Sequence, residues 1–182
     1  MSSGSPSATR HCYPMAPLIR STLVLLYLAL VLPLPALAPA GLRNWLLLLV
    51  PLGLVLVLAL VSERVELDHE GIRVQAAPWC APVLKRGWQL PWGQVKALVP
   101  VATSQGGRVY YVRTGQEARL LPQRVQNFED FLQRFSHHSG LDTSGVQRLT
   151  PPWTYQLLAA SSALMLAAEL LVGAIRLSGG HY

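Results

Sequence analysis

Charged residues are scarce in this sequence: only 13% of its 182 residues are Asp, Glu, Lys or Arg, whereas 51% are hydrophobic. With a mean hydropathy of +0.33, the chain carries too little charge for an ordinary soluble domain. The composition therefore predicts a membrane protein. Because membrane helices use much of this length, only one small extramembrane domain fits into the remainder.

Cysteine is also scarce, which excludes a disulfide framework. Cys12 and Cys80 lie far apart and form no CxxC pair, so we expect two free thiols. His137 and His138 are adjacent and would diverge on a helix, and the acidic residues between positions 63 and 70 favour one solvated strand face over a metal site. The sequence predicts no bound metal.

Catalytic sequence motifs are absent: the chain has no P-loop, dinucleotide fingerprint, nucleophile elbow or HExxH motif. We therefore expect no enzymatic activity and no cofactor. Nucleic-acid binding is also disfavoured, because residues 62–150 hold 11 Lys and Arg against 8 Asp and Glu, with no concentrated basic stripe.

Three long apolar runs are present, over residues 18–38, 42–61 and 153–177. Each is long enough to cross roughly 30 Å of hydrocarbon, which predicts three transmembrane helices, the first two forming a hairpin. Pro33 and Pro35 should bend or end the first helix. A signal-peptide cleavage site near residues 38–41 is the alternative, but the second run, which follows at once, favours an uncleaved hairpin.

Basic residues predict the orientation of these spans. Arg10, Arg20 and the excess of Lys and Arg over Asp and Glu in residues 62–150 lie on one side of the predicted membrane, whereas only Arg43 and Arg176 lie on the other. The positive-inside rule then puts the N-terminus and the middle domain of this multi-pass protein in the cytoplasm.

The middle segment changes its hydrophobic period. Short alternating stretches separated by turn residues predict five to seven antiparallel strands over residues 62–125, with a hairpin at QGG 105–107. Asn127 should cap a helix whose Phe128, Phe131, Leu132 and Phe135 form a core stripe rather than a cofactor site. We expect an α+β membrane protein, with a disordered tail over residues 1–17, a helical hairpin over 18–61, a small β-sheet or barrel domain with its helix over 62–150, and the third span with a short tail over 151–182.

Several motifs in the middle segment carry a resemblance. They are EGI at 70–72, LPW at 90–92 followed by Val95, LP at 121–122, and Phe128 with Leu132. The chain resembles the bacterial membrane-anchored pleckstrin-homology-like (PH-like) domains, in which a C-terminal helix plugs a small β-barrel. The stretches DHEGI and VRTGQEARLLP are similar to the two-helix photosystem I assembly factor family, which lacks a third span. Both resemblances imply a non-catalytic, membrane-tethered binding module that acts as an assembly, accessory or scaffold factor, and the second suggests a thylakoid membrane.

A polar seam runs along the third span, since Tyr155, Ser162, Glu169 and Arg176 recur every seven residues and drift by only about −20° per step. Small residues beside it recur every four, the spacing that lets another helix approach closely. We expect this edge to face protein, either the hairpin or subunits of a membrane complex. The alternatives for Glu169 are a purely structural role or ligand chemistry. The predicted partner-binding residues are Tyr155, Ala159, Ser162, Ala163, Ala167, Glu169 and Arg176.

Basic and aromatic residues gather in APWCAPVLKRGWQLPWGQVK, residues 77–96. Lys and Arg attract anionic headgroups, and indole rings settle at the membrane interface. The functional interpretation is anionic-lipid binding, and the alternative is a solvated loop with core tryptophans. The predicted lipid-binding residues are Trp79, Lys85, Arg86, Trp88, Trp92 and Lys96.

Overall fold

The computed structural model of the protein describes residues 10–84, 87–104, 106–148 and 151–179. It divides the chain into two compact units, which are described separately below. A β unit consists of Met1–Ala16 and Ser62–Thr150, and a helical unit consists of Pro17–Val61 and Pro151–Tyr182.

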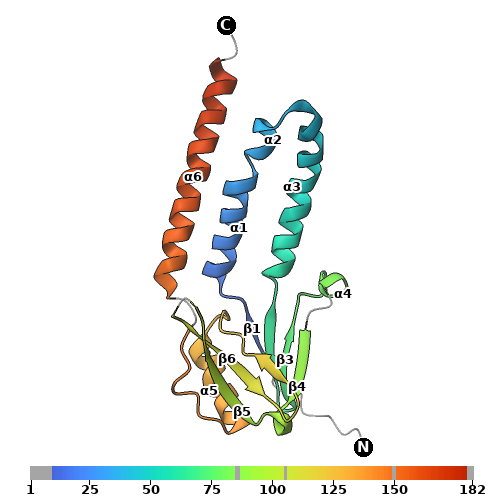
Figure 1. The fold of residues 1–182 in the computed structure, drawn as a ribbon, viewed down its shortest axis with the longest axis vertical. Coiled ribbons are helices and arrows are strands. Elements are labelled where there is room, and N and C mark those ends of the chain that lie inside the picture. The colour runs from blue at the N-terminus through green and yellow to red at the C-terminus, as the bar shows by residue number, and fades with distance from the viewer. Residues whose placement is uncertain (1–9, 85–86, 105, 149–150, 180–182) are drawn as a thin grey trace, which may run out of the picture. The chain divides into compact units, whose positions relative to one another are not determined.

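The described part of the β unit contains two small antiparallel sheets, which confirms the α+β class (Figure 1). The first sheet has the order β1-β2-β3-β4 and the second has the order β5-β6-β7. The strands are β1 His11–Pro14, β2 Arg64–Leu67, β3 Gly71–Gln75, β4 Gly87–Pro91, β5 Ala97–Ala102, β6 Arg108–Arg113 and β7 Ala118–Leu120. Short helical turns, α4 at Ala81–Leu84 and η1 at Trp92–Gln94, flank β4.

The N-terminal tail supplies a strand, which corrects the prediction of disorder over residues 1–17. β1 pairs antiparallel with β2, so that Tyr13 lies opposite Val65. The four residues of β1 are too few to show an alternating pattern in the sequence. Burial of the Tyr13 ring and the hydrogen bonds with β2 offset the conformational entropy that these residues lose when they are ordered. The prediction for residues 1–9 lies outside the described part. The helical hairpin is thus an insertion between the first two strands of this sheet.

The core of the β unit is filled by helix α5, Phe128–Ser139, together with residues of both sheets. Phe128, Phe131, Leu132 and Phe135 are all buried, which confirms the predicted core stripe. Asn127 occupies the N-cap position, but it adopts a left-handed conformation with φ of 50° and its side chain makes no capping hydrogen bond, contrary to expectation.

The predicted hairpin is observed, whereas the acidic residues between positions 63 and 70 are placed differently from the prediction. β5 and β6 form the expected hairpin, with Gly106 at φ of +78°. Asp68 does not lie on a solvated strand face; its Oδ1 accepts hydrogen bonds from the amides of Glu70 and Gly71 and holds the β2–β3 turn. Glu66 does not lie on a solvated face either, because it is only 7% exposed and accepts a hydrogen bond from Gln75 Nε2 at 2.7 Å.

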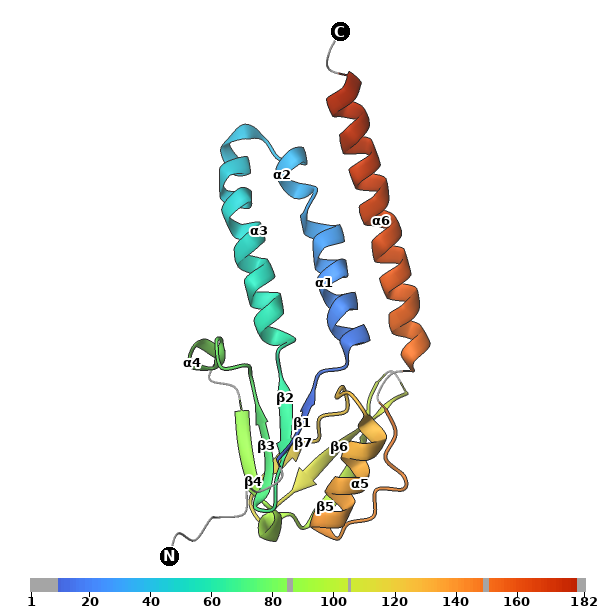
Figure 2. The same cartoon turned by 180° about the vertical axis from the view of Figure 1, so that it is seen from behind.

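The helical unit contains three helices that are long and apolar enough to span a membrane. The first is broken, as Pro33 and Pro35 predict, into α1 and the single turn α2. Figures 1 and 2 show α1 lying between α3 and α6, and α6 packs along α1. The helices are α1 Pro17–Val31, α2 Leu34–Leu37, α3 Ala40–Leu60 and α6 Pro152–Gly179.

A tyrosine fastens α1 to α3. The Tyr27 hydroxyl donates a hydrogen bond to the Val50 carbonyl oxygen at 2.6 Å. Pro51 has no N–H to give to the carbonyl one turn earlier, yet α3 continues through it. A Cβ atom at Gly53 would clash with the Tyr27 hydroxyl oxygen, so any larger residue at this position would force Tyr27 to move.

Candidate functional site

The Tyr155 and Ser162 part of the polar seam of α6 faces α1. Thr22 of α1 is fully buried, and its Oγ1 lies 2.7 Å from the Leu18 carbonyl oxygen and 3.2 Å from the Tyr155 carbonyl oxygen, so that it bridges the two helices. Ser162 is 3% exposed and donates its hydroxyl to the Leu158 carbonyl within α6. The sequence allowed either the hairpin or a partner protein to cover this edge. In the structure, the hairpin covers Ser162 and the half-buried Tyr155.

Glu169 continues this seam toward the far end of α6. Its Oε2 atom is buried and has no hydrogen-bond partner among the described residues. A buried carboxylate oxygen without a hydrogen-bond partner costs free energy in an apolar environment, so a donor placed beside this oxygen would stabilise Glu169. Arg176 lies in α6, but its side chain is outside the described part of the chain.

The alanines of α6 do not share one environment. Ala159 is half-buried beside the seam, whereas Ala163 and Ala167 are exposed. At ~100° per residue these two lie about 100° and 140° round the helix from Ser162, so they point away from α1. They belong to a row of exposed small side chains that we call the outer ridge, which consists of Ala160, Ala163, Ala167 and Ala174.

The four predicted lipid-binding residues that the structure describes have different environments. Trp79 is 56% exposed before α4, and Lys96 is exposed before β5. Lys85 and Arg86 lie outside the described residues. Trp88 and Trp92 pack against the hydrophobic core instead.

Trp92 in particular packs against the core and is partly buried. Its ring meets Phe135 edge-on, with centroids 5.5 Å apart, and stacks on His138 at 5.3 Å. Its Nε1 donates a hydrogen bond to the Asp68 carbonyl oxygen at 2.8 Å. Both its apolar and its polar parts are therefore satisfied inside the β unit, which favours the alternative interpretation of a core tryptophan.

A polar network that the sequence did not reveal joins β1 to α5. The Tyr13 hydroxyl donates a 2.5 Å hydrogen bond to Asp130 Oδ2, and Arg134 Nε donates to the same carboxylate at 3.0 Å. Arg134 Nη1 lies 3.0 Å from His11 Nε2. These residues line or adjoin a polar pocket of about 250 Å³ between the tail and the start of α5. No local pattern could signal the link, because Tyr13 and Asp130 are 117 residues apart.

The network shifts the acidities of its members. Burial raises the pKa of Tyr13 to about 12, and the hydrogen bond to Asp130 and its charge add to the effect. The hydrogen bonds from Tyr13 and Arg134 lower the pKa of Asp130 below its ordinary value of 3.8. Both shifts stabilise one proton arrangement, a neutral tyrosine and an ionised carboxylate, which is typical of a structural bond.

Metal-binding geometry is absent from the part of the chain that the structure describes. Within it, no group of three or more His, Cys, Asp or Glu side chains could hold a metal ion. Cys12 and Cys80 are not joined by a disulfide, as expected; Cys12 is exposed, and the buried Cys80 thiol donates to the Ala77 carbonyl oxygen at 3.3 Å.

Comparison with known proteins gives one similarity of high coverage. The chain is 42% identical over 170 residues, covering 90% of this chain and 85% of the relative, to the "Uncharacterized protein slr0269" of Synechocystis sp. (strain ATCC 27184 / PCC 6803 / Kazusa). No family model matches the chain, and no solved structure matches it.

Proposed function

The chain belongs to the same family as the Synechocystis protein slr0269, and from that premise we propose that it is a non-catalytic integral membrane protein that binds other membrane proteins. Its three apolar helices insert into the bilayer, and its β unit is a PH-like domain tethered to them. It acts as an assembly, accessory or scaffold factor for a membrane protein complex.

The outer ridge of α6 is the observation that carries this proposal. Its four alanines are exposed along one side of an apolar helix whose opposite side is already occupied by α1. Small side chains let the backbone of another helix approach closely, so that packing and weak interhelical hydrogen bonds accumulate. A lipid chain gains nothing from such a row, whereas a partner helix does.

The architecture of the β unit supports the PH-like assignment. Two small antiparallel sheets of four and three strands enclose a core into which α5 inserts its phenylalanines. That arrangement fits a small barrel plugged by a C-terminal helix. Because β1 pairs with β2, the N-terminal tail and the domain share one side of the membrane, and the distribution of basic residues favours the cytoplasmic side.

A photosystem is the candidate complex, and a thylakoid is the candidate membrane. Two observations support this choice: the resemblance of DHEGI and VRTGQEARLLP to the photosystem I assembly factors, and a relative that comes from a cyanobacterium. The alternative function, a sensor of anionic headgroups through residues 77–96, is less well supported, since Trp88 and Trp92 pack against the core.

The proposal is tested by enlarging the ridge. We expect Ala163→Ile with Ala167→Ile to abolish co-migration of the tagged chain with a larger complex on native gels of its own membranes, because the added carbons hold a partner helix away. Ala168→Ile is the matched control, since Ala168 is also exposed and lies about 100° round the helix from Ala167. Unchanged complexes in the double variant, or equal loss in the control, would refute a ridge-specific contact.

A further inference from the structure

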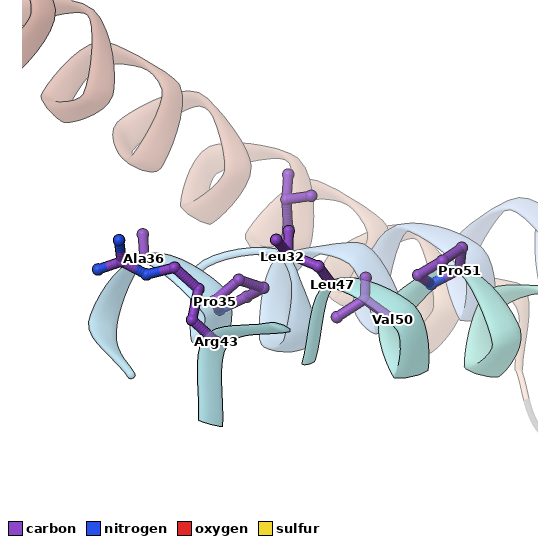
Figure 3. Close-up of a pocket in the computed structure, with 7 residues that line it drawn as sticks. All are labelled: Leu32, Pro35, Ala36, Arg43, Leu47, Val50 and Pro51. Carbon is purple, nitrogen blue, oxygen red and sulfur yellow. The ribbon is translucent and has the colours of Figure 1, made fainter. Parts of the chain in front are cut away.

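A groove between α2 and α3 lies at the turn of the helical hairpin (Figure 3). Its volume is about 650 Å³, within the range of cavities that hold small amphiphilic ligands. One wall comes from the end of the first span and the other from the beginning of the second. Six of its seven lining residues carry no charge: Leu32, Pro35, Ala36, Leu47, Val50 and Pro51.

The seventh lining residue is Arg43, which gives the groove one cationic end. Figure 3 shows its side chain extending beside Pro35 and Ala36. Arg43 is exposed, and its guanidinium group makes no hydrogen bond or salt bridge with any residue that the structure describes. Segment 17–61 contains no Asp or Glu that could neutralise it.

The start of α3 adds to the positive potential at this end. The helix begins at Ala40, its N-cap residue Pro39 makes no side-chain capping bond, and its first turn contains no acidic residue. The positive end of the helix dipole therefore lies beside Arg43. A positive end and an apolar wall of about 12 Å, from Arg43 to Pro51 at ~1.5 Å per residue, describe a site for an amphiphile with an anionic head.

We propose that this groove binds an anionic phospholipid of the surrounding bilayer. Arg43 pairs with the phosphate of the headgroup, and one acyl chain lies along Leu47, Val50 and Leu32. Charge complementarity selects this occupant: in a zwitterionic lipid the cation of the headgroup offsets the charge of its own phosphate, which weakens the attraction to Arg43. A second copy of the chain would have to bring an acid, of which the helical segments contain only Glu169. The site rests on the proposed membrane insertion but not on the outer ridge.

The test uses the full chain, purified in mild detergent and titrated with dioleoyl phosphatidylglycerol or dioleoyl phosphatidylcholine under native mass spectrometry. We expect a preference for phosphatidylglycerol that Arg43→Gln weakens by about fivefold, the effect of one interfacial cation. Arg20→Gln, which removes an exposed charge from the start of α1, is the matched control and should keep the preference. Arg43→Lys should restore most of it.

A second pair of variants tests the apolar wall. Ala36→Phe should fill the groove and release bound lipid, whereas Leu37→Phe, on an exposed neighbour outside the groove, should not. Equal binding of both lipids, or equal losses in the two arginine variants, would overturn the site. Conversion of a dimer into a monomer by Ala36→Phe would assign the groove to a second copy instead. Release of the chain from membranes by alkaline carbonate would refute membrane insertion itself.

Discussion

Replacing Tyr13 by Phe tests whether the N-terminal tail is held in the β unit as its edge strand. The substitution keeps the ring, which packs edge-on against Phe131 with centroids 5.5 Å apart, and removes only the hydroxyl that donates to Asp130 at 2.5 Å. A hydrogen bond to a charged group contributes about 1.5–3 kcal/mol. We take the lower end, because the Asp130 side chain is 47% exposed and water can replace the lost donor.

The expected loss of about 1.5 kcal/mol corresponds to roughly a tenfold faster opening of β1. Hydrogen exchange followed by mass spectrometry, on the full chain in detergent micelles, measures this rate in peptides that cover β1 and β2. Tyr111→Phe is the matched control, because the half-buried Tyr111 hydroxyl makes no side-chain hydrogen bond with the described residues. Tail amides that exchange at the rate of an unstructured peptide in the unmodified protein would refute the strand altogether.

Four further predictions concern stability. The pKa of Tyr13 is about 12 in the folded protein and 10.0 ordinarily, so its contribution to stability is present below pH 10 and is lost as the pH rises from 10 to 12. The stability of Tyr13→Phe should therefore not show this decrease between pH 10 and 12 in alkaline unfolding curves. The lowered pKa of Asp130 acts in the opposite sense: its contribution is present above pH 3.8 and lost below it, and Asp130→Asn should flatten acid unfolding. Gly53→Ala should lower the melting temperature of the helical unit by forcing Tyr27 away, and Tyr27→Phe in the same chain should recover part of the loss. Phe135→Ala should cost the β unit about 3–5 kcal/mol in urea unfolding, since Phe135 is fully buried.

The features that sequence reasoning predicted correctly are local. The phenylalanine stripe of α5 shows its helical period within eight residues, and Pro33 ends α1 because its ring and missing N–H act on the same turn. β1 was missed because its partner strand begins 50 residues after it ends, beyond the hairpin. A four-residue strand has no period of its own, and only its distant partners order it.

The same limit applies to the candidate site. A period of seven predicted that Tyr155, Ser162 and Glu169 share an edge of α6, and the structure agrees, but the sequence could not tell that α1 covers this edge. The outer ridge could be recognised only once the structure showed that α1 occupies the opposite side of α6. Likewise, composition grouped Trp79 with Trp92, although tertiary packing exposes the first and buries much of the second against Phe135.

Photo-crosslinking in intact native membranes tests the proposed function most directly. A benzophenone amino acid is placed in turn at Ala163 and Ala167 on the outer ridge, and at Ala168 as the control on another face of α6. We expect both ridge positions to form a crosslink to one defined membrane protein subunit, whereas position 168 forms none. Crosslinks of equal yield from all three positions, or none from the ridge, would rule out the outer ridge as a partner surface.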